Sequence, residues 1–336
     1  MLDRFQDNPN LLFNEFFVNC YINPMISFIN LYDQSYRKAA FMNGYSYLLK
    51  PFQYRMVPFR YVQHTEEFVE NFKNAVTVEY RNYKNPKDFI SEIREELSLG
   101  SHIIMFVDLY YWAPQIGLPQ DIHFGHAMPI LSYQSDIDGF HLYDIDKNLN
   151  YRHYQVTSRC IVEAYNQTCE YVCSSETTEL IPKEEIKLYD YAVIRPKDKL
   201  ESYKISKEQL VANTKRLIKE LTALQLVRSN HDAISQIVIE NPSLGTLSCT
   251  NLSQMQKGNK MLFQELNRLG MIDDGHLCQL EEKAQQLSHQ TMSILGKIVK
   301  NNLLNNWTDV ADILRQVEDQ NKEEILLWKR LYEALQ

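Results

Sequence analysis

The stretch FGHAMPILSYQSDIDGFHLYDID, residues 124–146, decides the fold because it has the pattern of a β-hairpin. Two apolar segments, 126–133 and 140–145, flank a polar turn. Asp138 and Gly139 in that turn form a dipeptide typical of tight hairpin connections. We therefore expect two neighbouring antiparallel strands here.

The same hairpin carries a histidine and an acid. His126 opens the first strand, and Asp144 or Asp146 ends the second. Adjacent strands lie about 4.8 Å apart, so side chains of matching faces meet across the pair. A histidine held by a carboxylate is the base-and-orienter half of a Cys–His–Asp or Ser–His–Asp site. We expect Asp144 to be the orienter, and the turn register leaves Asp146 open.

Cys20 is the candidate nucleophile for this site, although a cysteine taken alone is more often a core residue. Apolar residues after it recur at helical spacing, namely Ile22, Met25, Ile26, Ile29 and Tyr32, so a helix packed by one face is expected. A cysteine at the start of such a helix meets the positive end of the helix dipole and free N–H groups, which favour a thiolate.

Two helix boundaries are compatible with the residues around the cysteine: Asn19 as the N-cap, or Asn23 as the N-cap with Pro24 as the first helical residue. Asn14 lies six positions before Cys20. Its amide is a candidate donor to an oxyanion, together with the Cys20 backbone N–H.

Aromatic residues beside the hairpin are candidates for substrate binding. Tyr110, Tyr111 and Trp112 follow the apolar run 101–112, which reads as a buried strand. They either wall a substrate pocket or belong to an ordinary core. Asp108 interrupts the run, so it is either paired in the core or aimed at a substrate amine.

The rest of the chain predicts two domains of an α+β protein, with a domain of mixed structure at 1–197 and an all-helical domain at 198–336. A helix is expected over 86–99, ending at Gly100, and a strand over 189–194. After Pro196 long amphipathic helices are expected across 207–227, 253–269, 274–300 and 308–334, with Leu210, Leu217, Leu221 and Leu224 on one stripe.

Composition excludes several classes of function. A formal charge of −8 without a basic cluster argues against nucleic acid, and no apolar run approaches the roughly 20 residues of a membrane span. The acidic N-terminal stretch lacks the pattern of a signal peptide, so the chain is expected to be cytoplasmic. The six cysteines then predict no disulfide framework. Cys169 and Cys173, near Cys160 and His153, lack the paired spacing of a structural zinc site, so no metal or cofactor is expected.

The order of these motifs resembles the papain-like fold, in particular the bacteriocin-processing peptidases and, more closely, the butirosin-biosynthesis acyltransferase family. The resemblance rests on FVDLYYW at 106–112, FGHAMPILSY at 124–133 and LYDID at 142–146, and covers roughly residues 10–195. It implies Cys20 as nucleophile, His126 as base and Asp144 as orienter. The chain departs from the pattern at Asn14, where the peptidases have a Gln, and at Tyr21, where a small residue follows the cysteine.

What the resemblance implies is amide formation in secondary-metabolite (antibiotic) biosynthesis, in which the cysteine takes an acyl group from an acyl carrier protein thioester and passes it to a small amine. The alternatives are a cysteine peptidase or thioesterase, or a catalytically silent papain-like scaffold that binds a partner. The helical domain offers modest basic sites for a carrier, at Lys215, Arg216 and Lys219 and at Lys297 and Lys300. The sequence leaves open whether the chain forms a homodimer.

Overall fold

The chain divides into two units. In a computed structural model, the residues described are 12–16, 18, 20–47, 63–82, 86–118, 120, 125–146, 151–173, 191–227, 231–240 and 242–336. The first unit comprises Met1–Arg37 and Asn71–Ser202, and the second comprises Lys38–Glu70 and Tyr203–Gln336. The division after Ser202 lies close to the predicted one, whereas Lys38–Glu70, which the prediction counted with the first domain, groups with the helical unit.

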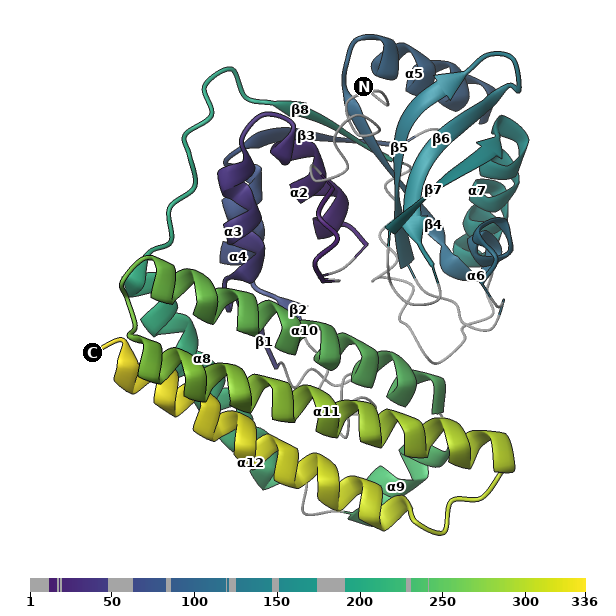
Figure 1. Ribbon diagram of the computed structural model, residues 1–336. Coiled ribbons are helices and arrows are strands. Elements are labelled where there is room, and N and C mark those ends of the chain that lie inside the picture. The colour runs from purple at the N-terminus through teal and green to yellow at the C-terminus, as the bar shows by residue number, and fades with distance from the viewer. Residues whose placement is uncertain are drawn as a thin grey trace. The chain divides into compact units, whose positions relative to one another are not determined.

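The first unit is built on a six-stranded antiparallel sheet, which together with the helices gives the predicted α+β class (Figure 1). The strand order is β3-β8-β4-β5-β6-β7. Its strands are β3 (Val76–Arg81), β4 (His102–Asp108), β5 (Gly125–Gln134), β6 (Gly139–Ile145), β7 (Tyr151–Thr157) and β8 (Tyr191–Pro196). The predicted hairpin is confirmed as β5–β6, and the predicted strand near residue 190 as β8.

The turn of this hairpin uses its two signal residues differently from the expectation. Asp138 adopts the left-handed conformation, with φ of 43°, while Gly139 already belongs to β6 and faces Gln134. A Cβ atom on Gly139 would lie 2.4 Å from the carbonyl oxygen of Val156 in β7. Glycine is therefore required for the close approach of β7 rather than for the turn.

Helices cover both faces of the sheet. On one face, α5 (Pro86–Ser98) and α7 (Ser158–Cys173) pack apolar side chains on the central strands. On the other face lies α2 (Ile22–Asn30) (Figure 1). Its Phe28 stacks on His102 of β4 with 4.3 Å between ring centroids. The periodicity that predicted the helices at 86–99 and after Cys20 is confirmed.

The apolar run 101–112 is not one strand. β4 ends at Asp108, and the chain turns into the short helix α6 (Leu109–Trp112) and the 3₁₀ helix η5 (Ala113–Ile116). The carboxylate of Asp108 accepts a hydrogen bond from the N–H of Tyr110 at 3.0 Å, so it caps α6. A capping side chain overrides the strand propensity of the aromatic residues that follow.

The second unit is helical, as predicted. Its long helices are α8 (Lys207–Val227), α9 (His231–Glu240), α10 (Pro242–Arg268), α11 (Asp274–Leu304) and α12 (Val310–Ala334). The predicted leucine stripe of α8 is buried, with exposed fractions of 2% or less. Shorter elements complete the described chain: η2 (Gln34–Tyr36), α3 (Arg37–Phe41), β1 (Tyr45–Ser46), β2 (Gln63–His64) and α4 (Glu66–Lys73). None of the helices among the described residues has the length and apolar character to cross a membrane.

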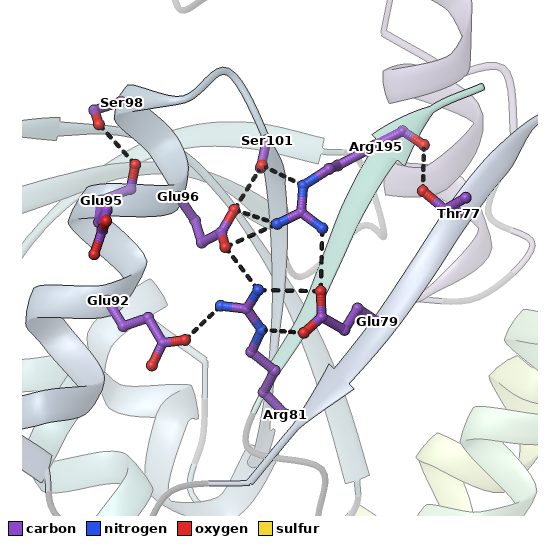
Figure 2. A network of polar contacts seen from close by, with 9 residues as sticks. All are labelled: Thr77, Glu79, Arg81, Glu92, Glu95, Glu96, Ser98, Ser101 and Arg195. Atoms are coloured by element: carbon purple, nitrogen blue, oxygen red, sulfur yellow. Dashed lines mark hydrogen bonds and ion pairs between the residues drawn. The ribbon is translucent and has the colours of Figure 1, made fainter. Parts of the chain in front are cut away.

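A network of ion pairs joins β3, β8 and α5 at one edge of the first unit (Figure 2). Arg81 pairs with Glu79 at 2.8 Å, with Glu96 at 2.7 Å, and with Glu92. Arg195 pairs with Glu79 at 3.1 Å and with Glu96 at 2.7 Å. Glu96 is buried, and hydrogen bonds from Arg81 and Arg195 lower the pKa of Glu79 to about 2. The network therefore fixes the edge strand to α5 with mutually compensated charges, among which Glu96 is buried.

Replacing Arg81 with Met is expected to lower the free energy of unfolding by roughly 1–3 kcal/mol, because buried Glu96 loses a charged donor. Urea unfolding measures the loss. Arg159→Met is the matched control, since Arg159 forms a solvent-exposed pair with Glu163 and exposed pairs contribute little. Equal effects of the two substitutions would contradict a structural role for the network.

Candidate active site

His126 and Asp144 are diagonal neighbours on the hairpin. Ile130 of β5 pairs with Leu142 of β6, and continuing this register places residue 128 opposite Asp144. Side chains two residues apart along a strand share a face. His126 and Asp144 therefore meet, and Nε2 of His126 donates a hydrogen bond to Oδ1 of Asp144 at 2.8 Å.

The alternative acid has another partner. Asp146 follows the end of β6, and its Oδ2 accepts from Nε of Arg152 at 2.6 Å. The contact expected between Asp144 and His126 is therefore the one that the structure contains.

Asp144 is held rigidly in the interior. It has no exposed surface. Besides His126, the N–H of Ile145 donates to Oδ1 at 2.7 Å, and the indole Nε1 of Trp112 donates to Oδ2 at 2.6 Å. Three donors on one buried carboxylate stabilise its charge and fix its orientation, so it holds the imidazole in one position.

Cys20 lies on the other side of the imidazole, in the turn before α2. Its Sγ accepts a hydrogen bond from the N–H of Ala127 at 3.3 Å, and its side chain also makes a hydrogen bond with His126. Because Nε2 of His126 is bound to Asp144, the ring nitrogen that serves Cys20 is Nδ1. Cys20 is partly exposed, whereas His126 and Asp144 are buried. Of these three residues, the cysteine is therefore the one that solvent can reach.

The charge of His126 follows from these neighbours. Burial alone would favour the neutral ring, but the charge and hydrogen bond of Asp144 and the contact with Cys20 outweigh burial and raise the pKa of His126 to about 10. The imidazole is therefore protonated at neutral pH. The protonated ring lies in hydrogen-bond contact with the Cys20 side chain.

Asn23 positions the segment that carries the cysteine. It is buried, its Oδ1 accepts from the N–H of Val18 at 2.8 Å, and its Nδ2 donates to the carbonyl oxygen of Phe16 at 2.8 Å. Both contacts tie the chain just before Cys20 to the first turn of α2. The direction in which the sulfur points thus depends on a buried amide.

The helix itself begins at Ile22, with Tyr21 in the N-cap position and no side-chain cap. The prediction of an Asn23 cap is wrong because that side chain is used for the preceding segment. Asn19 lies outside the described residues. Pro24 falls within the first turn, where its missing N–H has no intrahelical partner to lose.

Asn14 lies beside this segment and is anchored to the sheet. Its Oδ1 accepts from the N–H of Tyr151 in β7 at 3.0 Å, which leaves its Nδ2 without a partner among the described residues. Tyr151 is buried, and burial together with the charges of Cys20 and Asp144 raises its pKa well above the ordinary value. Sequence reasoning missed Tyr151 because only the folded pairing of β7 with β6 brings it near the site.

The predicted substrate residues have other contacts. Asp108 is buried as the cap of α6, and Trp112 is buried against Asp144, so both support the site from inside the core. Tyr110 and Tyr111 are partly buried and pack edge to face on each other. Tyr111 also contacts Tyr171 of α7. These contacts are those expected of a core segment, and a role of Tyr110 and Tyr111 in binding a substrate stays a prediction.

A different aromatic group lies next to the cysteine. Tyr21 stacks on Phe106 of β4 with 5.9 Å between ring centroids. Its hydroxyl is 3.1 Å from that of Tyr80 in β3. The sequence offered no signal for this group beyond the position of Tyr21, because its members are far apart along the chain.

The described residues contain no group of three or more His, Cys, Asp or Glu side chains that could hold a metal ion. No protein-family model matches this chain, and no curated protein matches it. The function is therefore inferred from the contacts of the site itself.

The raised pKa of His126 predicts how the stability of the protein varies with pH. A group whose pKa is raised by folding stabilises the folded state fully below its unfolded pKa, which is about 6.5 for histidine. This contribution is lost as pH rises through the folded value of about 10. The difference in free energy of unfolding between wild type and Asp144→Asn should therefore be large at pH 6 and shrink toward pH 10. Urea titrations at both pH values measure it, and a constant difference would contradict the charged pair.

Proposed function

We propose that the first unit is a cysteine-dependent acyltransferase of papain-like fold, resembling the butirosin-biosynthesis acyltransferases, that moves an acyl group from a thioester to a small amine. One observation carries the proposal: Cys20, His126 and Asp144 form a continuous chain of sulfur, imidazole and carboxylate. Each group has the neighbours that nucleophile, base and orienter require.

The arrangement of elements supports the papain-like part of the proposal. The cysteine precedes a helix on one face of an antiparallel sheet, and the histidine and the acid come from two neighbouring strands. The order along the chain is Cys20, His126, Asp144. A helix and a sheet thus supply opposite sides of one site.

In the first half-reaction the Cys20 thiolate attacks the thioester carbonyl. The C–S bond of the donor breaks, and the imidazolium of His126 gives its proton to the departing thiol. The product is a new thioester on Cys20 and a free donor thiol. Asp144 stabilises the imidazolium before the transfer and keeps the ring in place afterwards.

The tetrahedral intermediate needs donors for its oxyanion, and Asn14 is suited to this role. Its Oδ1 is occupied by the N–H of Tyr151, which orients the amide so that Nδ2 is left to donate. The backbone N–H of Cys20 is the second proposed donor. Loss of one such donor typically lowers kcat by roughly 10²–10³.

In the second half-reaction a neutral amine attacks the acyl-enzyme. His126, now neutral, accepts the proton of the attacking nitrogen, the S–C bond breaks, and an amide and the Cys20 thiolate are released. Amine attack is favoured over hydrolysis where water is excluded. The burial of His126, Asp144 and Tyr151 around the sulfur supports this preference.

The donor is proposed to be a carrier-bound acyl thioester, and not every basic residue considered for docking is available. Arg216 donates to the carbonyl oxygen of Tyr45 at 3.1 Å, and Lys297 pairs with Asp312 at 2.7 Å. Arg216 also pairs with Glu220 at 3.8 Å, so both cations are partly neutralised within the helical unit. The proposal of a carrier-bound donor is therefore based on the proposed chemistry and not on these basic residues.

Incubation with an acyl N-acetylcysteamine thioester and a small primary amine tests the proposal. Chromatography with mass detection separates three products: amide is expected from an acyltransferase, free acid from a thioesterase or peptidase, and neither from a silent scaffold. Only amide formation above the uncatalysed rate supports the proposal.

Two variants test the assigned roles in the same assay. Asp144→Asn should lower kcat by a factor on the order of 10² or more, because the imidazolium loses its counter-charge. Asp146→Asn is the matched control and should have little effect, since Asp146 pairs with Arg152. Asn14→Ala should lower kcat roughly 10²-fold or more while leaving alkylation of Cys20 unchanged, because alkylation forms no oxyanion. A larger loss for Asp146→Asn than for Asp144→Asn would overturn the assignment.

A further inference from the structure

Phe106 is unusual among the residues of β4. This strand is central in the sheet, and every other residue from His102 to Asp108 is buried, whereas Phe106 is partly exposed. Phe106 faces Ala127 across the β4–β5 pair, and the N–H of Ala127 donates to Sγ of Cys20 at 3.3 Å. The uncovered part of this face therefore lies beside the nucleophile.

Two tyrosines extend the aromatic surface. Tyr21 stacks on Phe106, and Tyr80 lies 6.4 Å from the Phe106 ring centroid to centroid. The hydroxyls of Tyr21 and Tyr80 are 3.1 Å apart, and Tyr80 is 40% exposed. A set of three rings, with both tyrosine hydroxyls turned toward each other, presents ring surface next to the sulfur.

The charged residues next to Tyr80 on β3 form their ion pairs on the face of the sheet opposite to Tyr80. Glu79 and Arg81 flank Tyr80 and pair with each other and with α5 or β8. Because side chains alternate along a strand, Tyr80 points to the face of Phe106 and these charges point away. A charged acyl group beside Cys20 would find no counter-charge from β3.

We propose that Tyr21, Phe106 and Tyr80 form the acyl-binding surface and that the donor carries an aromatic or comparably flat apolar group next to its thioester carbonyl. This inference rests on the proposed acyl transfer at Cys20 and names its substrate class. The carbonyl must reach Sγ, so the substituent next to it lies within contact of Phe106 and Tyr21. Ring–ring contacts favour edge or offset packing at 4.5–7 Å between centroids, the range in which these three rings already lie.

Alkylation tests this surface without requiring acyl transfer. Wild type is treated with 2-chloroacetamide or with N-benzyl-2-chloroacetamide, which share one reactive group, and peptide mass spectrometry gives the rate at each cysteine. Exposed Cys278 supplies the intrinsic ratio of the two reagents. The benzyl reagent should be favoured at Cys20 by about tenfold over that ratio, because ring burial lowers its barrier.

The variants Tyr80→Ala and Phe106→Ala should bring the ratio of the benzyl rate to the chloroacetamide rate at Cys20 close to the ratio at Cys278. Tyr32→Ala is the matched control, because Tyr32 is a 45% exposed tyrosine just beyond the far end of α2 that packs on His102. It should keep the wild-type ratio. No preference in wild type, or the same loss in Tyr32→Ala as in Tyr80→Ala, would overturn the acyl-binding surface.

Acyl transfer is then measured with acetyl and phenylacetyl N-acetylcysteamine thioesters. A higher kcat/KM for phenylacetyl than for acetyl transfer, with a ratio of the two that falls in Tyr80→Ala, supports the substrate class. Equal kcat/KM for the two donors overturns it while leaving the acyltransferase proposal standing. Benzyl preference in alkylation without any acyl-enzyme would keep the aromatic surface, overturn its assignment to an acyl donor and reject the proposed function.

Discussion

His126 and Asp144 are joined by a hydrogen bond between two strands, and both side chains are buried in the interior of the first unit. The carboxylate is charged and buried, so it must be compensated, and the imidazolium together with the indole of Trp112 and the N–H of Ile145 does this. Removing the histidine would leave the acid with neutral donors only. The same pairing keeps His126 charged, and the ring lies in hydrogen-bond contact with the Cys20 side chain. Under the proposed function, the reactivity of Cys20 depends on this buried contact.

Residues outside the hairpin also help to position the side chains of the site. The absence of a side chain at Gly139 lets β7 approach β6 closely, and β7 then supplies the N–H that anchors Asn14. Asn23 binds the segment before Cys20 to α2, so the sulfur is placed by a buried amide rather than by a helix cap. The hydrogen bonds of Asn14 and Asn23 therefore hold the segment that carries Cys20 in place beside His126 of the sheet.

Periodicity and turn chemistry were sufficient to predict the hairpin, the helix after Cys20 and the helical second unit, because those patterns are local. The pairing of His126 with Asp144 was predictable for the same reason. The role of Trp112 was not, since its indole reaches Asp144 from a helix 32 residues earlier in the chain. The strand predicted over 101–112 ends early at Asp108, because the Asp108 side chain caps α6 and this cap competes with the β propensity of the following residues. The aromatic group of Tyr21, Tyr80 and Phe106 is assembled only by the sheet order, which local patterns do not encode.

The most direct test of the central claim is the relative rate at which iodoacetamide alkylates Cys20 and Cys278 at neutral pH, followed by peptide mass spectrometry. Cys278 is exposed and Cys20 only partly so, hence access alone would favour Cys278. If the imidazolium of His126 sustains a thiolate, Cys20 reacts faster, and Asp144→Asn slows Cys20 without changing Cys278. Faster reaction of Cys278 in wild type, or an unchanged rate at Cys20 in Asp144→Asn, would contradict a coupled Cys20–His126–Asp144 site.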